Sequence, residues 1–269
     1  MAATDAIAKP PVPSGALRWR ASMPRIVAGV AIFLGWEIVV RLFAPDYVAK
    51  PSTILMAFPK VATDPAFLAA VGITLAAVAE GLLIALVAGT IIGLAMGRST
   101  LTDRLLRHYV NGFYAVPMIV ILPLVSLWFG YSGGARLATI VFAAIFAIII
   151  NAADGARAVP KDFIEVARSF RSRPARMLYE IVLPASTPYL LAGLRLAAGR
   201  ALIGAVVAEF FTAIPGLGYF ILYNSRILHH AEAFVAVIFL AGFGVGFDVL
   251  TSWATRRFLP WYRRDEIRE

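Results

Sequence analysis

The chain has 269 residues, of which 60% are hydrophobic and only 15% are charged, and its mean hydropathy is +0.79. Soluble domains are about 45–50% apolar and about 25% charged, so these values exclude a disordered, collagen-like or ordinary cytosolic protein. The sequence contains no cysteine, which excludes disulfides, thiolate metal sites and cysteine nucleophiles. A net charge of +9 would suit a nucleic-acid-binding protein, but its meaning depends on where the charges lie.

The apolar residues gather in six long runs, each near the ~20 residues that a helix needs to cross a membrane. The predicted spans are 26–43, 75–97, 109–129, 137–151, 189–213 and 234–255. Residues 1–25 are polar and lack the apolar core of a signal peptide, so they are expected to form a cytoplasmic tail. The sequence therefore predicts an all-α membrane protein: a bundle of about six transmembrane helices over 26–258, with a second cytoplasmic tail at 259–269.

The distribution of Lys and Arg orients this bundle. If the N-terminus is cytoplasmic, 18 of the 25 basic residues fall in inside segments and two, Arg195 and Arg200, lie within the fifth span. The outside segments hold the other five, which are Arg41, Lys50, Lys60, Arg136 and Arg226. Cytoplasmic loops of membrane proteins carry such an excess, so both termini are expected inside. The basic charge reflects topology, and we expect no nucleic-acid partner.

Small residues and prolines mark particular spans. Gly89, Gly93 and Gly97 recur at four-residue spacing, which predicts close helix packing within the bundle or, as an alternative, a dimer contact. The sixth span carries a glycine cluster over 242–246. Pro117 and Pro123 lie in the third span, where proline removes a backbone donor. They predict a helix that lines a cavity or bends at a gate; a purely structural kink is the alternative.

Charged residues inside the spans are the default candidates for a functional path. They are Glu37, Glu80, Arg195, Arg200, Glu209 and Asp248. Arg200 and Glu209 are the deepest, and their spacing puts them on different faces of one helix, so each requires a partner on another helix, a ligand or water. Together with Pro117 and Pro123, they form the candidate translocation path.

The loop between the fourth and fifth spans, about 152–187, is long, charged and yet patterned as a structured segment. Apolar residues recur at helical spacing from Phe163 to Phe170, and a second amphipathic segment runs to Leu183-Pro184. Two short amphipathic helices on the cytoplasmic side are therefore expected. Their apolar faces would lie in the lipid headgroup region or in a groove of a soluble partner.

The residues of this loop resemble a known motif. Glu165-Val166-Ala167-Arg168-Ser169-Phe170, followed by Ile181-Val182-Leu183-Pro184, is similar to the EAA loop of ATP-binding cassette importer permeases. The resemblance continues through 185–195, Val206-Val207-Ala208-Glu209 and Gly216-Leu217-Gly218-Tyr219, and upstream through 122–124 and 127–130. These segments resemble the branch of binding-protein-dependent inner-membrane permeases that handles nitrate, sulfonates and taurine.

The resemblance implies a transport subunit rather than an enzyme. The loop would form a coupling helix that docks in a groove of a cytoplasmic ATPase subunit, through Phe163, Ile164, Glu165, Val166, Ala167, Arg168, Ser169, Phe170 and Arg171. The permease would be a homodimer in the bacterial inner membrane, supplied by an external or periplasmic substrate-binding protein. The sequence has no phosphate-binding loop, so ATP and Mg²⁺ would be held by the ATPase, with no cofactor in this chain.

The substrate implied by this branch is a small anion such as nitrate, taurine or an aliphatic sulfonate, although relatives also handle thiamine-precursor pyrimidines and aromatic acids. One departure concerns Arg171, which stands where the family has glycine, a residue suited to a left-handed turn. Either the turn is rebuilt in this chain or Arg171 accepts some strain. Two other classes remain open. An ion-coupled secondary carrier would use Glu37, Glu80 or Asp248, and a membrane-embedded enzyme would need a catalytic cluster that the sequence lacks, as it also lacks a metal-binding motif.

Overall fold

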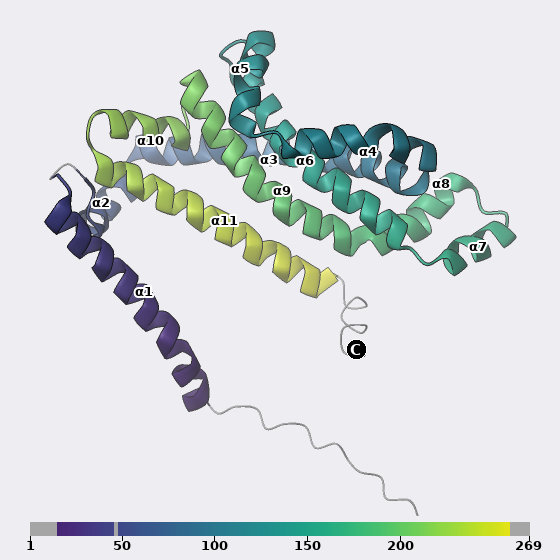
Figure 1. Ribbon diagram of the computed structural model, residues 1–269, viewed down its shortest axis with the longest axis horizontal. Coiled ribbons are helices and arrows are strands. Elements are labelled where there is room, and N and C mark those ends of the chain that lie inside the picture. Colours follow the sequence, from purple (N-terminus) through teal and green to yellow (C-terminus); the bar gives the residue numbers. More distant parts are fainter. Residues whose placement is uncertain (1–14, 46–47, 259–269) are drawn as a thin grey trace, which may run out of the picture.

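The computed structural model describes residues 15–45 and 48–258, and every regular element in these two ranges is a helix (Figure 1). The long helices are α1 (Gly15–Phe43), α3 (Pro65–Arg98), α6 (Gly133–Ala158), α9 (Leu183–Thr212) and α11 (His230–Phe258). Shorter helices are α2 (Pro51–Ala62), α4 (Thr100–Ala115), α5 (Met118–Phe129), α7 (Lys161–Ser169), α8 (Pro174–Met177) and α10 (Leu217–Arg226), together with the π-helix η1 (Leu178–Val182). The predicted all-α fold is confirmed for these residues.

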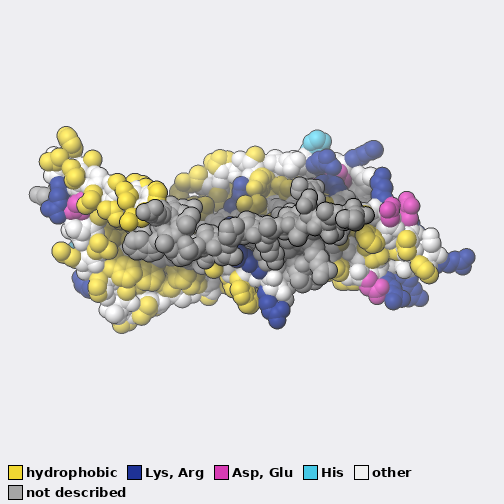
Figure 2. Space-filling view, turned by 90° about the horizontal axis from the view of Figure 1, so that it is seen from below, with side chains coloured by type: hydrophobic (Ala, Val, Ile, Leu, Met, Phe, Trp, Pro, Cys, Tyr) yellow, Lys and Arg dark blue, Asp and Glu magenta, His cyan; other side chains and the backbone are white. Residues whose placement is uncertain are grey.

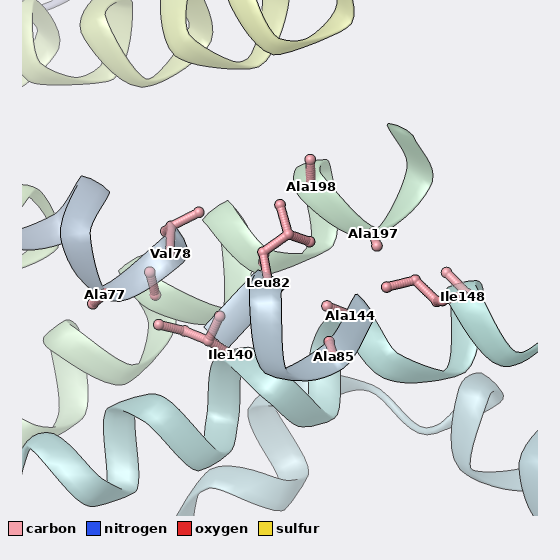
Figure 3. Packing of buried hydrophobic residues seen from close by; sticks show 12 residues of the cluster. Ala77, Val78, Leu82, Ala85, Ile140, Ala144, Ile148, Ala197 and Ala198 are labelled. Atoms are coloured by element: carbon pink, nitrogen blue, oxygen red, sulfur yellow. The ribbon is translucent and has the colours of Figure 1, made fainter. Parts of the chain in front are cut away.

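The core lies where α6 packs along both α3 and α9. Most of its buried residues are alanines, such as Ala198, and the branched side chains among them are Val78, Leu82, Ile140 and Ile148 (Figure 3). Inside a membrane the surrounding lipid is as apolar as the side chains, so helices associate by packing closely, which small residues allow. The alanines of α9 and the glycines of α3 supply that closeness.

The glycines of α3 confirm the packing prediction. A Cβ at Gly93 would lie 2.5 Å from the Ala152 Cβ and 2.5 Å from the Ile149 carbonyl oxygen. A Cβ at Gly97 would lie 2.5 Å from the Ala156 Cβ, and one at Gly89 would lie 2.9 Å from the Ile148 side chain. These glycines therefore serve contact within one chain rather than a dimer contact. The prediction does not extend to α11, because Gly242, Gly244 and Gly246 have no neighbouring atom within 4 Å of an added Cβ among the described residues.

Four helices are long and apolar enough to cross a membrane, and a fifth span exists if α4 and α5 together form one. The four are α3, α6, α11 and the continuous helix from Pro174 to Thr212. The first predicted span, 26–43, lies within α1, which reaches the rest of the bundle mainly through α2 (Figure 1). Its role as a sixth span remains a prediction.

The third predicted span, 109–129, is not one helix. The chain bends by 104° between α4 and α5. A residue before proline is pushed out of the helical region, and Val116 is extended at φ −69° and ψ 127°. Pro117 continues that conformation before α5 begins. Pro123 lies inside α5 without interrupting it, so only Pro117 breaks the span.

The membrane helices extend beyond the predicted loop boundaries at the α7 end. Residues 152–158 belong to α6 and residues 183–187 to α9, which leaves a shorter segment around α7 as the connection. The predicted stop at Leu183-Pro184 is wrong, because η1 runs directly into α9. The Leu183 N–H bonds to the Leu178 carbonyl five residues back, and single π-turns of this kind occur inside continuous α-helices.

The two ends of the bundle differ in composition. Helices α7 and α8 lie at one end and α2 and α10 at the other (Figure 1). Lys and Arg side chains gather at the α7 end, whereas hydrophobic side chains cover much of the rest of the visible face (Figure 2).

Residues 15–25, predicted as part of a tail, are helical in α1, since Ala, Leu, Arg and Met favour helices. Residues 1–14 and the predicted tail at 259–269 lie outside the described ranges.

Candidate functional site

The coupling-loop prediction corresponds to helix α7, which is nine residues long and confirms an amphipathic helix at this position. Asp162 lies in its first turn and Arg168 in its last, which matches the positive and negative ends of the helix dipole. Ile164 and Ala167 lie one turn apart and are 5% and 7% exposed. They attach the helix to the end of the bundle.

The attachment is a small apolar cluster that joins α7 to three membrane helices. Ile164 packs with Leu94 of α3, Ala156 of α6 and Val182 at the end of η1, directly before α9, and Val159 completes the cluster. Because close-packed side chains transmit displacement rather than absorb it, a movement of α7 would move the ends of these helices. Ile164 and Ala167 therefore face the bundle, in contrast to the rest of the predicted coupling set.

A second apolar stripe of α7 faces away from the bundle. Phe163, Val166 and Phe170 are 60%, 56% and 82% exposed. Their spacing puts them on one side of the helix, and Glu165, Arg168 and Ser169 are exposed beside them. A helix that anchors itself with one apolar stripe and exposes another has the form of a docking element.

Arg171 adopts the left-handed turn that glycine would give, with φ at 53°. The Arg171 N–H bonds to the Arg168 carbonyl at 2.8 Å and the Ser172 N–H to the Ala167 carbonyl at 3.0 Å. This pair of bonds is the Schellman arrangement that ends many helices. The turn geometry is therefore retained, and Arg171 bears the strain of a side chain in a left-handed conformation.

We expect Arg171→Gly to stabilise the folded chain by about 1 kcal/mol, because it removes this strain at a small cost in unfolded-state entropy. The thermal midpoint of the detergent-purified protein measures the effect. Arg173→Gly is the matched control, since Arg173 lies in the same turn with an ordinary φ of −64° and should lose stability on substitution. Loss of complex assembly in Arg171→Gly would instead identify Arg171 as a contact residue.

Two of the four predicted path residues meet in one cavity. Pro117 and Arg200 line a half-open space of about 320 Å³ at the break between α4 and α5, and residues of α6 and α9 form its other walls. The Arg200 guanidinium carbon lies 3.8 Å from the centroid of the Tyr114 ring, and its Nη1 is 3.5 Å from the Tyr114 carbonyl oxygen. Tyr114 was not predicted, because an isolated aromatic residue near a proline carries no signal of this contact.

Pro123 and Glu209 lie elsewhere. Pro123 is exposed on α5 and does not line the cavity. Glu209 is fully buried near the other end of α9. Each of the two was expected to need a partner on another helix, a ligand or water, and the structure gives both of them contacts on other helices: Tyr114 on α4 for Arg200, and residues of α3, α6 and α10 for Glu209.

The Glu209 carboxylate joins these three helices. It accepts hydrogen bonds from the Thr74 hydroxyl at 2.8 Å and from the Gly218 N–H at 2.8 Å. The Arg136 Nη1 lies 3.5 Å from the carboxylate and donates to the Pro215 carbonyl at 3.3 Å. The Thr74 hydroxyl also accepts from the Leu217 N–H, so the carboxylate holds the start of α10 against α3. A Cβ at Gly216 would overlap the carboxylate.

Comparison with known proteins identifies the family. The family model for the binding-protein-dependent transport system inner membrane component matches residues 81–264. The chain belongs to this family. It is accordingly a transmembrane permease subunit of an ATP-binding cassette importer, a transport subunit whose ATPase is a separate chain. The ion-coupled carrier alternative is set aside by this membership.

Three relatives illustrate the range of the family. The chain is 27% identical over 241 residues to a Bacillus subtilis aliphatic sulfonates transport permease protein, SsuC, covering 89% of this chain and 87% of the relative. It is 27% identical over 262 residues to the bicarbonate transport system permease protein CmpB of Synechococcus elongatus, with 92% and 94% covered. It is 29% identical over 250 residues to the nitrate import permease protein NrtB of Leptolyngbya laminosa, with 90% and 89% covered.

Solved structures show the same fold. A chain of the inward-facing methionine transporter MetNI superposes with a TM-score of 0.63 at 18% identity, covering 71% of this chain and 95% of that one. A chain of an amino acid ATP-binding cassette transporter superposes with a TM-score of 0.60 at 19% identity, covering 74% and 97%. Family members are inner-membrane components that work with a binding protein. A membrane location therefore follows for this chain, and its partners are an ATPase subunit and a substrate-binding protein.

Proposed function

We propose that this permease couples ATP hydrolysis in a partner subunit to the import of a small anion, and that α7 is the element through which it does so. The observation that supports this proposal is the pair of apolar stripes on α7. Ile164 is packed into the bundle, whereas Phe163, Val166 and Phe170 are exposed at the basic end of the molecule. Docking of the exposed stripe in a groove of the ATPase would give the helix a partner for each stripe.

The basic end of the bundle is the proposed cytoplasmic end, and we expect both termini on that side of the membrane. Cytoplasmic loops attract Lys and Arg, and the end that carries α7 and α8 is rich in them (Figure 2). At this end Arg157 bonds to Asp154 at 2.8 Å and also pairs with Asp103, which Arg107 contacts as well. The opposite end, with α2 and α10, would receive the external binding protein.

The proposed mechanism requires two states of the bundle with different affinity for the nucleotide-bound ATPase, because a ligand without such a preference shifts no equilibrium. ATP and Mg²⁺ would be held by the ATPase. Closure of the ATPase would displace α7, and the Ile164 cluster would carry that displacement to the ends of α3, α6 and α9. Two copies of the permease, as a homodimer, would enclose the path between them.

The proposed substrate is a small oxyanion. The relatives named above are described as permeases for aliphatic sulfonates, bicarbonate and nitrate, which share a negative charge carried on oxygen atoms. The cationic side chain of Arg200 lines the half-open cavity at the α4–α5 break, which is consistent with this charge.

Glu165→Arg tests the coupling role. We expect this variant to insert normally and to lose at least ~90% of ATP-dependent uptake, since an acidic contact would become repulsive and close charge pairs at interfaces are worth several kcal/mol. Uptake into proteoliposomes that contain the permease, its ATPase and its binding protein measures the loss. Glu180→Arg is the control, because Glu180 is also an exposed acid at this end but lies outside α7. Full uptake by Glu165→Arg would contradict the assignment of α7.

A further inference from the structure

We propose that the cavity at the break between α4 and α5 binds an organic anion, with the charged head of the solute at Arg200 and its carbon body against an aromatic wall. The inference rests on the proposed function and narrows it, because an organic sulfonate or carboxylate fits this cavity better than nitrate or bicarbonate does. Three features of the cavity support this inference: its position along the bundle, the charge of Arg200 and the aromatic side chains that line it.

The cavity lies about midway along the length of the bundle. At 1.5 Å per residue, Arg200 is about 25 Å from Leu183 at one end of α9 and about 18 Å from Thr212 at the other. Ala143, which lines the same cavity, lies near the middle of α6. Non-helical backbone at membrane depth is tolerated where it is buried in protein or lines a water-filled cavity, and the α4–α5 break lines this one.

The cavity contains the cationic side chain of Arg200, which has no carboxylate partner within residues 15–45 and 48–258. On the same helix, Arg195 pairs with Asp248, and nearer the outer end Arg136 pairs with Glu209. Within the described ranges Arg200 has no such ion pair; its contacts are the Tyr114 ring at 3.8 Å and the Tyr114 carbonyl oxygen at 3.5 Å. A charge at this depth is costly unless it is neutralised or hydrated, so the site favours an anion.

The wall beside Arg200 is aromatic. Phe113, Phe142 and Phe146 all line the cavity and pack on one another, with ring centroids 5.0–6.1 Å apart. An inorganic oxyanion would remain surrounded by polar groups and gain nothing from these rings. A solute with a hydrocarbon body gains by burying it there, and about 320 Å³ is enough for a small organic ion.

Photolabelling of the purified full-length permease tests this site without depending on transport. The probe is 4-azidobenzenesulfonate, applied to the protein in phosphatidylcholine nanodiscs, with mass spectrometry of the labelled peptides. We expect saturable labelling of the segments 113–118 and 142–146, with protection by ethanesulfonate at a concentration at least ~tenfold lower than by nitrate or bicarbonate.

Matched arginine variants test the charge. Arg200→Gln should raise the half-saturating probe concentration by about tenfold or more, whereas Arg200→Lys, which keeps the charge, should raise it by less. Arg195→Gln is the control, because it removes an arginine from the same helix outside the cavity, and it should label like the native chain. If Arg200→Gln does not insert, the Arg200→Lys comparison and the competition on the native chain decide the question.

Three results would overturn the inference: labelling elsewhere in the chain, equal protection by nitrate, or protection by phosphatidylglycerol instead of ethanesulfonate, which would indicate a lipid headgroup. Uptake assays distinguish failure of the proposed binding site from failure of the proposed importer function. ATP-dependent import of nitrate without labelling of the cavity would leave the importer assignment intact, whereas the absence of import for every oxyanion tested would remove it.

Discussion

Replacing Glu209 with alanine is expected to destabilise the permease by about 3–5 kcal/mol, the usual cost of removing one partner from a buried ion pair. The Arg136 side chain is only 15% exposed and would lose its counter-charge, while the Thr74 hydroxyl and the Gly218 N–H would lose their acceptor. The thermal midpoint of the purified protein and the yield of monodisperse material measure this loss.

Glu209→Gln is the control that separates charge from hydrogen bonding. A glutamine carbonyl can still accept from Gly218 or Thr74, so we expect a smaller loss, about 1–3 kcal/mol. The pair of variants also tests the remaining prediction that Glu209 lines the translocation path. A Glu209→Gln protein of native stability that failed to transport would place this residue in the path, whereas loss of stability with transport retained would assign it to the structure.

The second large effect is expected at Gly93. A leucine there has no room, because even its Cβ would lie 2.5 Å from the Ile149 carbonyl oxygen, a backbone atom that cannot turn aside. Helices α3 and α6 would have to separate, and overpacking of this kind costs about 3 kcal/mol or more. We expect Gly93→Leu to fail to accumulate as a folded protein.

Gly72→Leu is the matched control on the same helix, since an added Cβ at Gly72 has no neighbour within 4 Å among the described residues. Fluorescence-detected size-exclusion profiles of the two variants, each fused to a fluorescent protein, measure the difference. Normal accumulation of Gly93→Leu would contradict the close α3–α6 contact, and equal failure of Gly72→Leu would mean that leucine at either position disturbs insertion rather than packing.

The features that could be predicted from the sequence are those written in local patterns. Apolar runs located α3, α6, α9 and α11, and the spacing of Phe163, Ile164 and Ala167 predicted α7. The sequence leaves open whether the turn at Arg171 is rebuilt or retained under strain, and the structure shows that the left-handed turn is retained. Each of these properties depends on neighbours within one or two helical turns.

The features that could not be predicted depend on partners far along the chain. The ring of Tyr114 beneath Arg200 and the Arg136 side chain beside Glu209 come from other helices, and no local sequence pattern indicates either contact. From the sequence, Arg136 is only a charge in an outside segment. The π-turn before Pro184 was missed for a different reason, because leucine-proline commonly ends a helix and only the fold shows that this one continues.

Site-specific crosslinking can show directly whether α7 couples the permease to its ATPase. The native chain has no cysteine, so a single introduced thiol can be labelled uniquely. Ser169→Cys places a benzophenone-maleimide crosslinker on α7, and Ser225→Cys places the same reagent on α10 at the opposite end. If α7 docks on the ATPase, we expect a one-to-one adduct with the co-purified ATPase from position 169 and none from position 225. An ATPase adduct from position 225, or no ATPase adduct from position 169 in a complex that hydrolyses ATP, would contradict this docking of α7.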